Sequence, residues 1–521
     1  MLYRSLLLGS GAAFLLSAGA GAADLPTRKA AAVEYVKLCN VGGVTGWTLP
    51  GSDTCVKFSG YITGQFTGGT LATQYNWADT TVLAGIAGAP AVPFTQGLAT
   101  QRVLVAASAA QQNTTFHRNQ TGWTTRANFG FDLASNTAYG PLIGHFDLNA
   151  EMANGFDAIS TTTYVNTAYL TWAGLTAGVA QSFFSFTAGG DNWANLLSPD
   201  RKGFNEPPLL AYTASFSNGF TATISAESPG PVGSSGPGVD ATGAAGSNPG
   251  NITYGGQKWP DIVGSLHVKQ DWGEAQLSGV VHNVNVSSDA ITGGAVAAIG
   301  CGVVAQVNCD FQHTQIGWGL DAGVKVNLPS LGDGDNVLVT GAYSQSAVWY
   351  GGMGAGEMMW GESGQVNGNG QPMYLADAFF NPLTNRWSKP TAWSLTAVFE
   401  HHFTPQFYLD LEGSYGQISW SNMGGGCNLL GFGCGVAQAA QGPLSPRART
   451  WILGADLGWN PVANLNFDLE LMYQGTSQDR PSGFLGTVYN LGDAGGAVFA
   501  PGDWHGDSEG FAGRLRITRY F

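Results

Sequence analysis

The sequence predicts an all-β protein, a sixteen-stranded antiparallel transmembrane β-barrel with short periplasmic turns and long outer loops. Segments of about ten residues alternate apolar and polar side chains, which is typical of strands with one apolar face. The connections alternate between roughly two to six and roughly twelve to fifty residues, as at the two ends of an outer-membrane barrel. Charged residues make up only 11% of the chain, against roughly 25% in soluble proteins.

Composition also limits the possible partners. The chain of 521 residues has 35 acidic and 21 basic residues, a formal net charge of −14. Binding to nucleic acid needs clustered Lys and Arg, so this balance argues against it. Beyond the N-terminus, no stretch approaches the ~20 uninterrupted apolar residues of a membrane helix.

The N-terminus is predicted to be a targeting signal. Arg4 precedes an apolar run at residues 6–16, and Ala20-Gly21-Ala22 offers a small-residue cleavage site. We therefore divide the chain into a signal peptide at residues 1–22, a periplasmic-side segment at 23–54 and the barrel at 55–521. Export places the protein where disulfides survive.

The first half of the barrel is predicted from seven strands. The first covers residues 55–66, and a long stretch at 67–121 separates it from a pair at 122–133 and 140–151. Two hairpins follow, between residues 164 and 227, with turns at Ala173-Gly174 and Ser217-Asn218-Gly219. The predicted outer loops among these strands are residues 67–121, 152–163 and 185–208, and a Gly-, Pro- and Ser-rich loop follows at 228–260.

The second half is predicted from four hairpins and a final strand. These strands are residues 261–270 and 274–285, 315–328 and 335–346, 391–402 and 406–419, 450–460 and 465–475, and 510–521. The even count of sixteen places both ends of the barrel chain on the periplasmic side.

The last strand also predicts how the chain reaches its membrane. Its alternation ends in Phe521, which resembles the recognition signal of the outer-membrane assembly machinery. Arg519 falls on the lipid face but near the rim, where a charge costs ~0–1 kcal/mol rather than ~2–4 at the midplane. The side chains predicted to face lipid are Phe129, Phe146, Leu170, Leu515 and Ile517.

The opposite face of the strands is polar and is predicted to be the pore wall. Sixteen strands enclose a water-filled lumen, whereas eight enclose packed side chains. The predicted wall residues are Arg126, Asp132, His145, Asp147, Glu151, Arg514 and Arg516. A structural or adhesive barrel with a plugged lumen remains an alternative, as does a soluble secreted β-protein.

Six cysteines allow fifteen disulfide connectivities. Proximity in sequence favours Cys39 with Cys55, Cys301 with Cys309, and Cys427 with Cys434. Metal ligation is the competing interpretation, but the spacings are not CxxC and no His clusters with them. We therefore expect no metal site and no cofactor.

Other motifs give no sign of an enzyme. Asp333-Gly334-Asp335-Asn336 resembles a calcium loop, but its twelfth position is Ser344 where an EF-hand needs Glu, so a polar turn is expected. The sequence contains no HExxH and no phosphate loop. A barrel-borne hydrolase, with nucleophile and base on separate strands, stays open as an alternative.

Several stretches, in a shared order, resemble the general porin family of alphaproteobacteria. The resemblance implies a trimeric sixteen-stranded outer-membrane channel through which small hydrophilic solutes and ions diffuse. The matching stretches are Glu34 to Cys39, Pro50 to Cys55, Ala168 to Gly178, Gln181 to Phe184, Ala211 to Ala214, Asn218-Gly219-Phe220, Trp272-Gly273 and Trp459 to Val462.

The resemblance also implies that the third loop folds into the lumen as a constriction. Asp191, Asp200 and Glu206 would face water there, with Arg201 and Lys202 in the same loop. The inward Arg126, Arg514 and Arg516 would lie opposite and set up a transverse field. Loss of the signal peptide removes Arg4, which leaves 20 of the 21 basic residues against 35 acidic ones. A mild cation preference is therefore expected.

Overall fold

The structure is a computed structural model, and not all of the chain is described in it. The described residues are 37–69, 77–78, 102–106, 121–155, 160–186, 206–228, 253–254, 258–287, 312–353, 377, 379–381, 386–420, 447–479, 484–490, 497–501 and 507–521. Within them, no helix has the length and apolar character needed to cross a membrane.

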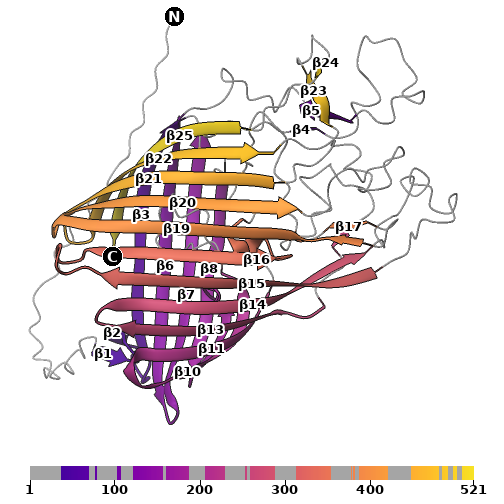
Figure 1. The fold of residues 1–521 in the computed structure, drawn as a ribbon. Coiled ribbons are helices and arrows are strands. Elements are labelled where there is room, and N and C mark those ends of the chain that lie inside the picture. Colours follow the sequence, from indigo (N-terminus) through magenta and orange to yellow (C-terminus); the bar gives the residue numbers. More distant parts are fainter. Residues whose placement is uncertain are drawn as a thin grey trace, which may run out of the picture.

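Sixteen of the described strands form a closed antiparallel ring, as predicted (Figure 1). Each strand pairs with the next around the ring, and β25 pairs with β3 to close it. The ring strands are β3 (Cys55–Gly69), β6 (Thr121–Thr137), β7 (Gly140–Gly155), β8 (Ser160–Trp172), β9 (Leu175–Val179), β10 (Pro208–Ser215), β11 (Phe220–Glu227), β13 (Asp261–Gln270), β14 (Gly273–Ser287), β15 (Gln312–Asn327), β16 (Asn336–Gln345), β19 (Pro390–Thr404), β20 (Phe407–Trp420), β21 (Arg447–Val462), β22 (Leu465–Gln478) and β25 (Asp507–Tyr520).

Smaller elements accompany the ring. A short 3₁₀ turn, η3 (Ser217–Gly219), joins β10 to β11, and a second, η4 (Trp349–Gly351), lies between β16 and β19. The remaining strands are β4 (Trp77–Ala78), β5 (Arg102–Ala106), β12 (Thr253–Tyr254), β17 (Phe379–Asn381), β18 (Arg386–Ser388), β23 (Phe484–Asn490) and β24 (Ala497–Pro501).

The two ends of the ring differ in the length of their connections. One end has tight turns, including the two-residue turns 138–139, 173–174 and 405–406. The other end has most of the long connections, as the sequence predicts. The second outer connection is an exception, because β7 and β8 extend until only residues 156–159 separate them. The predicted loop at 152–163 is therefore wrong in length.

The third outer connection starts earlier than predicted. The predicted loop begins at residue 185, but β9 already ends at Val179. Residues 180–186 leave the sheet. Phe184 and Phe186 are fully buried, so this segment does not lie on the lipid face. An apolar alternating run fits a buried segment inside the ring as well as a strand, which explains the error.

Two strands that the sequence analysis missed precede the ring. β1 (Leu38–Val41) and β2 (Val44–Thr48) form a hairpin, and β2 pairs with the start of β3. The predicted Cys39–Cys55 disulfide is confirmed and joins this hairpin to β3. Val41, Val44 and Ala134 pack around Cys55. The pairs Cys301 with Cys309 and Cys427 with Cys434 lie outside the described residues, as does the signal peptide.

The outer face of the ring is apolar. Large side chains that alternate along the strands are exposed there, as expected of a surface covered by lipid. Phe129, Leu170, Leu515 and Ile517 are among them, and Phe146 on the same face is partly covered by neighbours such as Phe131. Aromatic pairs gather near the short turns, for example Tyr139 with Trp172 and Phe407 with Trp459. They form an aromatic girdle at one membrane boundary.

Candidate functional site

The inner face of β20, β21 and β22 carries a group of carboxylates, which we call the acidic wall. Its members are Asp410, Glu412, Asp456, Asp468 and Glu470. Each has at most 7% of its surface exposed. The register places Asp410 opposite Asp456, and Asp456 opposite Glu470. Like charges directly opposite one another destabilise a sheet, so this wall requires compensating cations.

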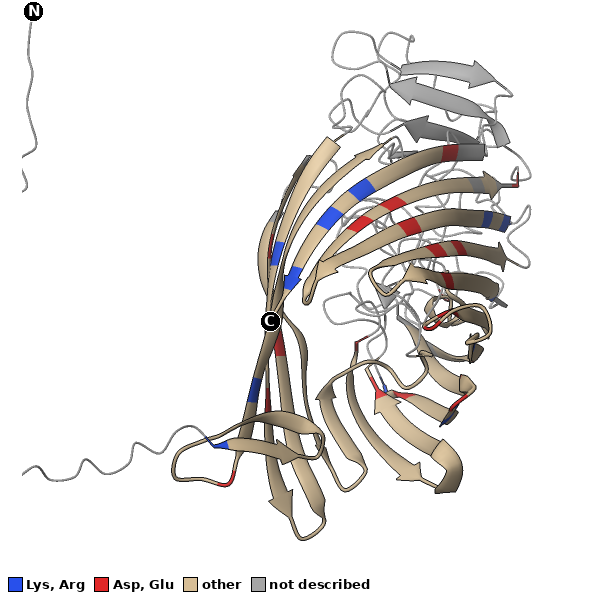
Figure 2. Cartoon of the chain, turned by 90° about the vertical axis from the view of Figure 1, so that its left-hand side faces the viewer, with Lys and Arg blue, Asp and Glu red and all other residues tan. Residues whose placement is uncertain are grey.

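Two arginines of the neighbouring strand β25 provide part of that compensation. Arg514 lies opposite Glu470 and forms an ion pair with it. Arg516 lies opposite Asp468, with its Nε atom 3.3 Å from Oδ2. Figure 2 shows basic and acidic positions side by side on neighbouring strands. Five carboxylates against two guanidinium groups leave a formal excess of three negative charges.

A second polar group lies on β6, β7 and β8. Arg126 forms an ion pair with the buried Glu151. Asn128 donates to Asp147 at 2.5 Å and to Asn149 at 2.9 Å.

His145 extends this network toward the short-turn end of the ring. Its Nδ1 atom lies 2.6 Å from Oδ1 of Asp132, and its Nε2 atom lies 3.0 Å from the Thr167 hydroxyl. These contacts join the inner faces of three strands.

The start of the third outer connection lies on the inner wall. Ser182 donates from its hydroxyl to Glu227 of β11 at 2.5 Å, and the Phe183 N–H donates to the same carboxylate at 3.1 Å. Gln276 of β14 donates to the carbonyl of Ser185 at 2.9 Å. Because these bonds satisfy the backbone away from the sheet, the segment is anchored inside the ring.

Strand order places this segment across the ring from the charged strands. β14, which anchors the segment, lies eight steps from β3 in either direction around the sixteen pairings. β25, β3 and β6 therefore form the opposite side. Arg514 of β25 and Arg126 of β6 lie on that side.

The arginines are not isolated charges, however, and the transverse field stays a prediction because Asp191 and Asp200 lie outside the described residues. Arg126, Arg514 and Arg516 each pair with a carboxylate on an adjacent strand. The carboxylate in each ion pair offsets the charge of the guanidinium, so the pair contributes little net charge to the lumen. Sequence alternation placed them on the inner face but could not show which residues they pair with.

Of the predicted constriction residues, Asp191, Asp200, Arg201 and Lys202 lie outside the described residues. Glu206 is described, and it is partly exposed just before β10. The acidic wall was missed, although its signal was present: Asp410-Leu411-Glu412 and Asp468-Leu469-Glu470 alternate acid with exposed leucine. No cluster among the described residues has the arrangement of a metal site.

A closed ring of sixteen antiparallel strands, apolar outside and polar inside, defines a transmembrane β-barrel of the outer-membrane type. A family model described as Porin subfamily matches residues 24–492, so this chain belongs to that family. The protein is an outer-membrane porin.

Individual relatives are similar at modest identity. Porin Omp2a of Brucella ovis is 28% identical over 286 residues, which cover 53% of this chain and 69% of that protein. Porin Omp2a of Brucella melitensis biotype 1 is 28% identical over 282 residues, which cover 53% of this chain and 65% of that protein. Porin Omp2b of Brucella neotomae is 25% identical over 437 residues, which cover 80% of this chain and 94% of that protein. The solved outer membrane channel DcaP of Acinetobacter baumannii aligns over 91% and 99%, at 12% identity and a TM-score of 0.49.

Proposed function

We propose that this porin is a water-filled channel for the passive diffusion of small hydrophilic solutes and ions, that it carries no enzymatic activity, and that it works as a homotrimer. The observation that carries the proposal is the closed ring of sixteen strands with charged and amide side chains on its inner face. Barrels of this strand number enclose an aqueous lumen rather than a packed core. The names of the Brucella relatives support the same function.

We further propose that the lumen prefers cations. The acidic wall has a formal excess of three negative charges, and Asp468 and Glu470 supply two of its carboxylates. A charged wall lowers the energy of counter-ions in the pore and raises that of co-ions.

The test is the reversal potential in a potassium chloride gradient across a planar bilayer. The wild type is expected to conduct with cation selectivity. The double variant Asp468→Asn/Glu470→Gln should shift the reversal potential toward anions, because it removes two carboxylates and leaves Arg516 and Arg514 without these ion-pair partners. Asp333→Asn, at an exposed turn outside the barrel strands, is the matched control and should leave it unchanged. An assembled wild type without conductance would favour a plugged structural barrel.

A further inference from the structure

A second chain segment also leaves the wall and lies across the inner face. Residues 346–353 follow β16 and include η4. Ala347, Trp349, Tyr350 and Met353 in this segment each have at most 5% of their surface exposed. The segment opens the sixth outer connection, which therefore begins inside the ring.

Two inward-facing glycines of the wall leave room for this segment. Gly319 of β15 faces inward, and a Cβ atom there would lie 3.0 Å from Cβ of Tyr350. Gly416 of β20 also faces inward, and its Cβ would lie 2.2 Å from Sδ of Met353. A larger side chain at Gly319 would press on Cβ of Tyr350 and push the segment inward, while one at Gly416 would have to move the Met353 side chain. The two glycines thus let the segment lie flat against four neighbouring strands.

A buried polar cluster anchors the segment. Tyr350 donates from its hydroxyl to Asp261 of β13 at 2.6 Å. His282 of β14 lies between two carboxylates, with Nδ1 2.8 Å from Asp261 and Nε2 3.3 Å from Asp377. Asp377 in turn accepts the Val348 N–H at 2.5 Å. Buried charges are retained only where they are paired and hydrogen-bonded, so the cluster fixes the segment in one place.

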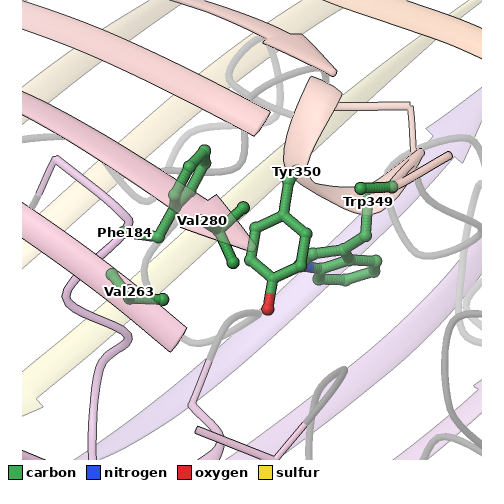
Figure 3. Packing of buried hydrophobic residues seen from close by; sticks show 6 residues of the cluster. Phe184, Val263, Val280, Trp349 and Tyr350 are labelled. Atoms are coloured by element: carbon green, nitrogen blue, oxygen red, sulfur yellow. The ribbon is translucent and has the colours of Figure 1, made fainter. Parts of the chain in front are cut away.

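The two inward segments touch each other. The rings of Phe184 and Tyr350 have centroids 4.9 Å apart in an edge-to-face arrangement. Figure 3 shows both rings beside Val263 and Val280 of the wall. A Cβ on Gly323 of β15 would lie 2.2 Å from Phe186, so the same strand makes room for both segments.

We propose that residues 346–353 form a second constriction element, which narrows the lumen together with residues 180–186 and sets the size limit for solutes. This rests on the proposed channel function. The segment crosses from β15 to β20, where Met353 ends over Gly416, four residues from Glu412 of the acidic wall. Solutes small enough to pass the two segments would thus meet that wall.

The test measures single-channel conductance and the exclusion limit for neutral polyethylene glycols. Gly319→Val should displace the segment and raise conductance by about twofold, because the narrowest diameter controls passage. It should also admit larger polymers. Gly264→Val is the control, since Gly264 of β13 is exposed and a Cβ there meets nothing within 4 Å. Assembly is checked by the heat-dependent migration of the folded barrel.

A second variant decides the matter if Gly319→Val does not assemble. Tyr350→Ala lies outside the barrel strands and removes both the ring contact with Phe184 and the hydroxyl bond to Asp261. It should raise conductance and the exclusion limit in the same way. An assembled Tyr350→Ala channel with wild-type values would overturn the second constriction while leaving the channel function intact. A wild type without conductance would instead refute the channel function.

Discussion

Asp335 shows how one side chain secures a turn at the end of the barrel. Its carboxylate accepts the backbone N–H of His402 at 2.9 Å and lies 2.6 Å from Nδ1 of His401. The hydrogen bond from the His402 backbone, followed by the bond and charge of His401, lowers the pKa of Asp335. Both partners belong to β19, so the carboxylate ties this turn to the neighbouring strand. The segment that resembles a calcium loop in sequence is therefore a hydrogen-bonded polar turn.

This pKa shift predicts a pH-dependent contribution to stability. A carboxyl group with a lowered folded-state pKa stabilises the fold above its unfolded pKa of about 3.9, and that stability is lost as the pH falls through the folded value. Asp335→Asn should therefore lower the urea midpoint near neutral pH, and the difference from wild type should shrink below about pH 4. Asp333→Asn serves as the exposed control. A difference that is constant with pH would contradict the role of the charge.

At the scale of the element, the strands could be predicted because alternation is local. β25 shows this clearly, since Leu515 and Ile517 are exposed while Arg514 is buried, as its pattern requires. The partners of those charges could not be predicted, because Arg514 meets Glu470 only through the register of two strands. The inward segment at residues 346–353 was missed for a related reason: the fit of Met353 over Gly416 depends on residues far apart in sequence.

β21 allows a test of its membrane-facing side. Leu453 lies near the middle of the strand and is 59% exposed, while Val462 ends the strand and is 60% exposed. Leu453→Arg should destabilise the folded barrel in lipid by ~2–4 kcal/mol, and Val462→Arg should destabilise it by only ~0–1 kcal/mol. Equilibrium unfolding in liposomes measures both. Equal costs would mean that the two positions do not differ in membrane depth.

The whole molecule is expected to assemble with two further copies. We base the homotrimer on the porin family to which the chain belongs and on the broad apolar outer face of the ring. Light scattering of the detergent-solubilised protein, corrected for bound detergent, should give a mass of three chains. A mass of one chain at the concentrations used for bilayer recordings would contradict this prediction, while the conductance test would still hold for a single barrel.

The pairing of β25 with β3 has a consequence for how the protein is made. The register runs from Ala512 with Gly69 to Tyr520 with Tyr61, and Phe521 donates its backbone N–H to the carbonyl of Gly60. The strand synthesised first among the sixteen thus receives its partner only after the last has been translated and exported. Until then β3 has one unpaired backbone edge, which can pair with other chains. Contacts between unfolded copies must therefore be prevented until the chain reaches the membrane. A chain truncated before β25 should aggregate rather than insert into the membrane.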